Sequence, residues 1–270
     1  MTWTYLSKRG TDEYVNMFAH GSGARPTVLE TWDYSQDSNP LVIRGIMKHK
    51  LIKQCWADDR QFRYIDSGYF GNKPSAANPS GWKHWHRIVD NNLQHGAVVR
   101  RPGDRWERFG IDMPRRRHGK AIIIAAPDAK PCVFYNIELA QWLANTKAEI
   151  EKYTDRPVYI RDRNPDPRFR ANNTFAQRIQ DDVHAVVVFN SVAATESILT
   201  GVPTFVLAPS NAAQPVSNTD LSQIEDPWYP TTDEIYAWTS HLAYGQFHID
   251  ELANGTAARI LTQTKELSNA

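Results

Sequence analysis

The stretch "HAVVVFNSVAATESILTGVPTFVLAPS", His184 to Ser210, decides the fold. It opens with a continuous apolar run, which is typical of a parallel strand buried on both faces. A small-residue segment of helical character follows, and it stops at Gly201 with Pro203 just beyond. A second apolar run begins directly after that proline. The stretch therefore predicts a strand, a helix and a second strand, which together make one βαβ unit.

Alternating strand and helix patterns continue on the N-terminal side of this stretch. Strands are expected at 121–127 and 156–164, and helices at 137–153 and 174–182. Alternation at this spacing favours a parallel sheet with right-handed crossovers, as in a Rossmann-like domain. Residues 232–268 are expected to form helices that pack back across both halves of the chain.

The first half of the chain is less regular. A short amphipathic helix, a strand entering a Gly-rich loop and a long Pro/Ser/Asn-rich loop are expected at 45–59, 62–71 and 72–87. The segment "PRRRHG", residues 114–119, is the best candidate for a linker. We therefore predict two domains, residues 1–116 and residues 117–270.

Composition and charge exclude several classes of protein. The 270 residues are 41% hydrophobic and 23% charged, as in an ordinary globular protein. The net charge is +1, so any attraction to nucleic acid or membrane must be local. No apolar run approaches the roughly 20 residues of a membrane span, and the N-terminus lacks the apolar core of a signal peptide. Cys55 and Cys132 show no disulfide or zinc pattern, so we expect a cytoplasmic protein.

Polar residues follow the predicted strands of the second half. Ligands of such a sheet bind at the carboxyl ends of its strands, so four loops should share one rim: 125–130, 161–173, 190–194 and 208–214. A helix that starts near Ser191 offers backbone N–H groups to a phosphate. Arginine binds phosphate with two parallel hydrogen bonds, and Arg161 and Arg163 lie in a neighbouring loop. The Gly-rich turns of NAD and ATP sites are missing, so we expect a different nucleotide ligand.

The segment "FNSVAATESILTGVPTFVLAPS", residues 189–210, resembles the donor-site signature of GT-B-like glycosyltransferases. In that family a strand ends at a small polar residue, the next helix carries a Glu, and Gly-x-Pro closes the unit. The matching positions here are Asn190-Ser191, Glu196 and Gly201-Val202-Pro203. The segment "PVSNTDLSQIEDPWYP" (215–230) is similar to small phage-type sugar transferases that glycosylate DNA bases. It is similar more loosely to capsule and sialic-acid transferases. In the first half the resemblance rests on "YIDSGYFG" and "WHRIVDNN".

The resemblance implies an α/β fold of GT-B type, with two Rossmann-like halves whose parallel sheets face a cleft and C-terminal helices that pack back. Residues 1–116 would bind the acceptor and residues 117–270 the nucleotide-sugar donor. The implied donor-binding residues are Asn190, Ser191, Val192, Thr195, Glu196, Arg161 and Arg163. An alternative stays open, in which Ser191 is only a helix cap and Glu196 a solvated carboxylate.

Inverting transfer needs a base that takes the proton of the acceptor hydroxyl. Asp66, at a strand end before a Gly loop, is the first candidate, and His20 in "FAHGSGARP" is the second. The alternatives are a turn-initiating Asp and an ordinary loop histidine. No Asp-x-Asp stands at a strand end, so no metal is expected. The donor, with a UDP-sugar as first choice, is then the only cofactor.

Residues 98–120 form a basic strip with eight Lys/Arg against three acids. Trp106 and Phe109 are interleaved with these charges. Cations for phosphates and rings for exposed bases are what a DNA-contacting surface needs, although a solvated linker has the same composition. The residues expected to contact an acceptor or DNA are Trp85, His86, Arg87, Arg115, Arg116 and Arg117.

The sequence therefore predicts a glycosyltransferase that acts on a hydroxyl acceptor. The first choice of acceptor is a hydroxymethylated pyrimidine in double-stranded phage DNA, modified in the bacterial host, and such a base would have to be flipped out of the duplex. The alternatives are a capsule or lipopolysaccharide saccharide transferase and a non-catalytic nucleic-acid-binding protein. The sugar, its nucleotide and the choice between inversion and retention stay open.

Overall fold

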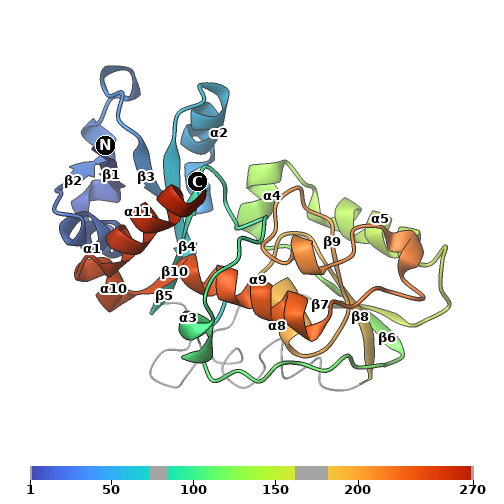
Figure 1. Ribbon diagram of the computed structural model, residues 1–270. Coiled ribbons are helices and arrows are strands. Elements are labelled where there is room, and N and C mark those ends of the chain that lie inside the picture. Colours follow the sequence, from blue (N-terminus) through green and yellow to red (C-terminus); the bar gives the residue numbers. More distant parts are fainter. Residues whose placement is uncertain (1, 73–83, 162–181, 269–270) are drawn as a thin grey trace. The chain divides into compact units, whose positions relative to one another are not determined.

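The computed structural model describes residues 2–72, 84–161 and 182–268, which form an α/β protein with two sheets (Figure 1). The chain divides into two compact units. Unit 1 consists of residues 1–73, 81–93 and 243–270, and unit 2 of residues 74–80 and 94–242. The predicted boundary at 116/117 placed residues 94–116 with the first half and the C-terminal residues with the second. In the structure, residues 94–116 belong to unit 2 and residues 243–270 belong to unit 1.

Unit 1 contains a six-stranded sheet with the order β10-β5-β4-β3-β1-β2. Its strands are β1 (Thr4–Ser7), β2 (Pro26–Val28), β3 (Leu41–Arg44), β4 (Phe62–Ser67), β5 (Trp85–Asp90) and β10 (Gln246–His248). Strands β1 to β4 run parallel to one another, whereas β5 is antiparallel to β4 and β10 is antiparallel to β5. The predicted loop 72–87 is therefore wrong at its end, where residues 85–87 belong to β5.

The helices of unit 1 are α1 (Glu13–Gly21), α2 (His49–Ala57), α10 (Ile249–Ala253) and α11 (Thr256–Ser268). The helix expected within 45–59 is confirmed as α2. Figure 1 shows α10 and α11, from the end of the chain, lying beside α1 from its beginning. A Cβ atom at Gly21 would lie 2.0 Å from the carbonyl oxygen of Leu252, so α1 and α10 approach this closely only because residue 21 has no side chain.

Unit 2 contains a four-stranded, wholly parallel sheet with the order β7-β6-β8-β9, as predicted for a Rossmann-like domain. Its strands are β6 (Ala121–Ala125), β7 (Val158–Arg161), β8 (Val183–Val188) and β9 (Thr204–Val206). Its helices are α3 (Asp104–Glu107), α4 (Ala129–Tyr135), α5 (Leu139–Ile150), α8 (Ala193–Leu199) and α9 (Thr232–Tyr244), the last of which runs on into unit 1. The predicted helix 174–182 lies almost wholly outside the described residues.

Short 3₁₀ turns connect these elements. They are Lys8–Gly10, Leu29–Thr31, Tyr34–Gln36 and Ile46–Lys48 in unit 1, and Gln214–Val216 and Leu221–Gln223 in unit 2. The core of unit 2 packs the buried strand residues Ile122, Val187 and Phe205 against Ile150 of α5. Across the described ranges, no helix is long and apolar enough to cross a membrane.

Candidate functional site

The strands of unit 2 end in one row. Ala125 at the end of β6 pairs with Arg161 of β7 and with Val188 of β8, and Val188 pairs with Val206 of β9. Neighbouring strands lie about 4.8 Å apart, so the four loops that follow leave the sheet from one edge. We call this edge the unit 2 rim. The predicted meeting of these loops is confirmed where the structure describes them, and residues 162–173 lie outside the described part.

The helix of the opening stretch begins at Ala193, two residues later than its expected start at Ser191. The Ser191 hydroxyl accepts a hydrogen bond from the N–H of Ala193 at 3.1 Å, and the Ser191 carbonyl accepts one from Ala194 at 3.1 Å. Ser191 therefore closes the turn that leads into α8, but it lies one position before the N-cap and is not the helix cap that the sequence left as an alternative. Val192 is the residue that flanks the helix, without a side-chain cap.

One glutamine and one asparagine side chain hold the rim loops together by hydrogen bonds. Gln94 donates from Nε2 to the carbonyl of Asn190 at 2.8 Å, and its Oε1 accepts from the N–H of Ala212 at 3.0 Å. Asn211 donates to the carbonyl of Ser191 at 3.4 Å. Both side chains are buried. The loops after β8 and β9 are thus held to each other and to residue 94.

These bonds also orient the backbone of the rim. In a planar trans peptide the N–H points opposite to the carbonyl. Because the carbonyls of Asn190 and Ser191 are held by Gln94 and Asn211, the N–H groups of Ser191 and Val192 point the other way. Neither N–H has a hydrogen bond to the described residues. Two neighbouring N–H donors at a strand end suit an anion.

Nothing in the sequence pattern pointed to Gln94. It lies 96 residues from its partner Asn190, in an irregular segment without periodicity. Asn211 had a weaker signal, because its loop was expected at the rim for topological reasons alone. Only the folded structure shows that both side-chain amides donate hydrogen bonds to backbone carbonyls of the loop after β8.

Replacing Gln94 by Leu is expected to destabilise the protein by about 2–4 kcal/mol, because a partly buried carbonyl and a buried N–H lose their partners together. Urea unfolding of the two proteins measures the difference. Gln223→Leu is the matched control, since Gln223 is exposed and its loss should change stability by less than about 0.5 kcal/mol. Equal unfolding curves for the Gln94 variant and the natural protein would contradict the bridging role.

The remaining predicted donor residues that the structure describes lie at or near the same rim. Arg161 ends β7 and is partly buried. Glu196 lies in the first turn of α8 and is partly buried, and Thr195 beside it is 1% exposed. The hydroxyl of Thr195 is buried without a hydrogen-bond partner among the described residues. Arg163 lies outside the described residues.

Asp66 lies near the end of β4 in unit 1, as expected, and three donors hold its carboxylate. The hydroxyl of Tyr64 donates to Oδ2 at 2.5 Å, and Arg87 donates to the same oxygen at 3.3 Å. The N–H of Ser67 donates to Oδ1 at 2.8 Å. The side chain is 35% exposed, so the carboxylate is accessible. Its Oδ1, which accepts the bond from Ser67, can accept a further hydrogen bond.

The electrostatics of Asp66 keep it ionised. Burial raises the pKa of this carboxyl, but the charge of Arg87 and the hydrogen bonds from Tyr64 and Ser67 outweigh that effect, so the pKa is lowered. The ionised form, which a general base requires, is therefore present at neutral pH. Asp66 is more than the turn-initiating residue that the sequence left as an alternative.

His20 was expected in a loop, and this is wrong. It lies exposed in the last turn of α1. Because α1 connects the parallel strands β1 and β2, it ends at the amino edge of the sheet, opposite to the carboxyl edge where Asp66 lies. The two candidate bases therefore belong to opposite ends of unit 1, and only Asp66 stands at a carboxyl strand end.

His86 and Arg87 were predicted to contact an acceptor or DNA, and their burial contradicts that role. His86 is 0% exposed, with its ring 3.9 Å from that of Tyr14. Arg87 is 6% exposed, and besides Asp66 it donates to the carbonyls of Ser67 and Leu93. Both side chains belong to the core. Trp85 stays partly exposed beside His248, with ring centroids 5.3 Å apart.

The basic strip is less exposed than its composition indicated. Arg105 and Trp106 are 5% and 2% exposed, so neither can serve an outside ligand. The exposed cations of the strip are Arg100, Arg108, Arg115, Arg116 and Lys120. Three of them have acids nearby, in the pairs Arg108–Asp104 at 3.9 Å, Arg116–Asp226 at 4.0 Å and Lys120–Asp182 at 3.9 Å.

Residues 115–117 do not act as a linker but pack within unit 2. The N–H of Arg117 donates to the carbonyl of Gly201 at 2.7 Å, just before β9 begins. This contact lies at the amino ends of the strands, so the predicted DNA residues Arg115, Arg116 and Arg117 are at the edge opposite to the unit 2 rim.

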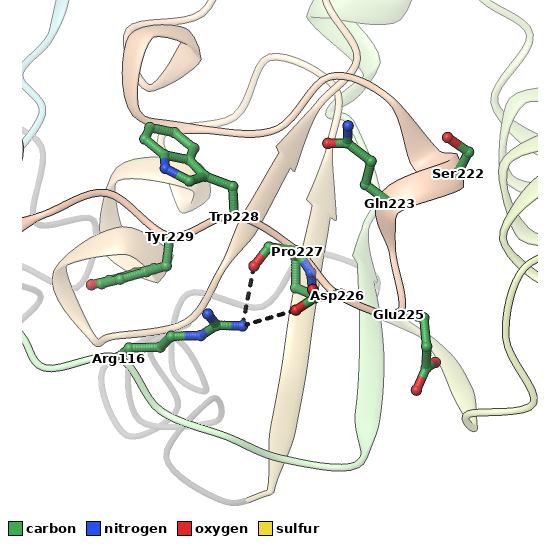
Figure 2. A pocket seen from close by; sticks show the side chains of 8 residues that line it. All are labelled: Arg116, Ser222, Gln223, Glu225, Asp226, Pro227, Trp228 and Tyr229. Atoms are coloured by element: carbon green, nitrogen blue, oxygen red, sulfur yellow. Dashed lines mark hydrogen bonds and ion pairs between the residues drawn. The ribbon is translucent and has the colours of Figure 1, made fainter.

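An open hollow of about 620 Å³ lies beside Arg116 (Figure 2). Figure 2 shows the Arg116 guanidinium reaching Asp226 and the carbonyl of Pro227, to which it donates at 3.1 Å. The chain next to this hollow contacts the start of β8, because His184 bonds the carbonyl of Ile224 at 2.8 Å. The hollow is thus at the amino edge and is separate from the unit 2 rim.

Several solved structures are similar to this chain. No protein-family model matches the sequence, and no curated protein matches it. Among solved structures, the chain is similar to Thermosulfurimonas dismutans KpsC, a beta Kdo 2,7 transferase, with 10% sequence identity and a TM-score of 0.39. The alignment covers 82% of this chain and 85% of that one. A likeness of this size carries no functional argument, so the case for a function rests on the residues of the site.

Proposed function

We propose that this protein is a glycosyltransferase that moves a sugar from a nucleotide-sugar donor to a hydroxyl acceptor. The observation that carries the proposal is the unit 2 rim. There the N–H groups of Ser191 and Val192 have no hydrogen-bond partner among the described residues, the following helix carries Glu196, and Arg161 ends a strand at the same edge.

Each of these groups has a role in sugar transfer. The two N–H groups and the Arg161 guanidinium would bind the donor diphosphate and stabilise the negative charge that grows on it as the bond to the sugar breaks. Glu196 would accept hydrogen bonds from a ribose or sugar hydroxyl. Asp66, ionised and accessible, would take the proton of the acceptor hydroxyl as it attacks. No step in this scheme requires a metal ion.

A panel of UDP-, GDP- and CMP-sugars is expected to raise the melting temperature of the protein, with one donor clearly ahead. Binding at 100 times Kd would stabilise the fold by about 2.7 kcal/mol. Glu196→Ala should remove this stabilisation, and Glu151→Ala, which changes an exposed carboxylate on α5, should leave it intact. If no nucleotide sugar stabilises the natural protein, the proposal fails.

For the acceptor, we propose a hydroxylated base in DNA as the first substrate to test, because exposed cations remain in the strip. If the strip binds duplex DNA, the logarithm of affinity should fall with the logarithm of salt by about 0.9 for each phosphate contact. The triple change of Arg115, Arg116 and Arg117 to Ala should flatten that slope. Changing Lys147 and Lys152, two lysines elsewhere in unit 2 whose side chains are 43% and 61% exposed, should not flatten it. Salt-insensitive binding would favour a saccharide acceptor instead.

A further inference from the structure

The carboxyl edge of the unit 1 sheet carries a group of cations that the proposed chemistry does not use. The strands β1 to β4 end together there, since Ser7 pairs with Val28 and Arg44 pairs with Ile65, one residue before Asp66. The first turns beyond these ends contain Lys8 and Lys48. The edge therefore places three cations, Lys8, Arg44 and Lys48, on the strand ends next to the candidate base.

Arg44 is held in place by its neighbours, but one of its hydrogen-bond donors is not used within the described residues. Its Nη1 lies 3.4 Å from Asp12 Oδ2, and its guanidinium carbon lies 4.4 Å from the centre of the Tyr14 ring. Its side chain is 26% exposed. The Nε atom, however, is buried and has no hydrogen-bond partner among the described residues. A buried donor of a charged group without a partner indicates a missing acceptor.

Lys48 is brought back toward the edge by the turn at Gly45, which has a φ of 82° and donates its N–H to the carbonyl of Ile65 at 3.1 Å. Lys48 is partly buried. Burial lowers the pKa of its ammonium, and the charge of Lys8 lowers it further, so like charges are crowded here. The positive charge of the group is not fully neutralised by its own neighbours.

The nearby acids are already engaged. Asp12 caps α1, accepting from the N–H of Val15 at 3.4 Å while it pairs with Arg44. Glu30 accepts from the N–H of Arg9 at 2.7 Å. Among the described residues, each of these two carboxylates thus has a donor of its own. Asp66, whose charge also interacts with Arg44, is held by Tyr64, Arg87 and Ser67.

We propose that Lys8, Arg44 and Lys48 form an anion site that binds a carboxylate or phosphate group of the acceptor. The assignment of this anion to the acceptor rests on the proposed function, with Asp66 as its base. Such a group would accept a hydrogen bond from Arg44 Nε and relieve the repulsion between the two lysines. It would also anchor the acceptor at the sheet edge where Asp66, the proposed base, lies. The acceptor is then a molecule that carries both a hydroxyl and an anionic group.

The test measures the binding of inorganic phosphate and of acetate to the full chain by thermal shift and isothermal titration. We expect a saturable stabilisation by at least one of the two, and the stronger of the two names the anionic group. Lys48→Met should weaken that binding at least tenfold. Lys53→Met, an exposed lysine on α2, is the charge-matched control and should change it less than twofold. Lys48 is the residue to change first, because Arg44 also contacts Asp12 and Tyr14 and its loss would disturb α1.

A further variant separates this site from the unit 2 rim, which is expected to bind phosphate too. Loss in Lys48→Met of an anion-binding site that persists in Arg161→Met supports the anion site. Loss only in Arg161→Met, or equal binding by all variants, overturns it. Failure of every nucleotide sugar to bind, together with Lys48-dependent anion binding, would refute the glycosyltransferase proposal and leave the anion site standing.

Discussion

Asp66→Asn is expected to lower the rate of sugar transfer by about 10²- to 10⁴-fold, the usual contribution of a general base. Donor-induced stabilisation should stay the same, because the residues proposed to bind the donor belong to the unit 2 rim. The amide keeps an oxygen for the N–H of Ser67, and Arg87 keeps the carbonyls of Ser67 and Leu93, so the fold should survive. Initial rates with saturating donor measure the effect.

Unit 1 offers a matched control for this change. Asp90 pairs with Arg63 at 3.1 Å on the same pair of strands, and its side chain is 42% exposed. Asp90→Asn removes the same charge from a similar ion pair but should leave transfer within about twofold. If both variants lose activity equally, the loss reflects the fold of unit 1. If neither does, the base lies elsewhere.

The pH profile adds a second reading of the same site. Because the pKa of Asp66 is lowered in the folded protein, its contribution to stability is present above the ordinary value of 3.8 and is lost as pH falls through the folded pKa. Activity that depends on ionised Asp66 should likewise persist down to acidic pH. Tyr64→Phe removes one of the donors to the carboxylate, so the acid limb of kcat/KM should move to higher pH.

Gly201→Ala is expected to destabilise the protein by about 3–5 kcal/mol, through backbone strain and overlap together. Gly201 has a φ of 87°, and a Cβ there would lie 2.1 Å from the carbonyl oxygen of Arg115. Gly110→Ala is the control in the same unit, since Gly110 also has a positive φ, of 57°, but nothing within 4 Å of an added Cβ. The control should cost only about 1–2 kcal/mol, the conformational part of the penalty.

Urea unfolding of the two glycine variants separates these contributions. A larger loss for Gly201→Ala would support the packing of residues 115–117 on the turn before β9. Equal losses would mean that this segment moves aside without cost. In that case the strip would behave as the linker that its sequence resembles.

Local pattern alone was sufficient for the βαβ unit formed by β8, α8 and β9. The apolar run at 185–189, the helix that stops at Gly201 and the next strand all appear in the structure as expected. Strands buried on both faces must be apolar throughout, and a glycine with a positive φ ends a helix, so both signals lie in neighbouring residues. Because parallel strands end at one edge, the rim position of Asn190 and Ser191 followed from topology. Asp66 followed in the same way from its strand end.

What the sequence could not determine depended on partners far along the chain. The Pro/Ser/Asn-rich composition of 72–87 predicts a loop through His86 and Arg87. In the structure both residues belong to β5, which β4 and β10 enclose, and both are buried. The C-terminal helices joined unit 1 because Gly21 allows α10 to approach α1. Gln94 became a bridge only when the loops after β8 and β9 met beside it. Local residues set the strand and helix patterns, but burial and hydrogen bonding of a polar side chain are set by whichever distant segment packs against it.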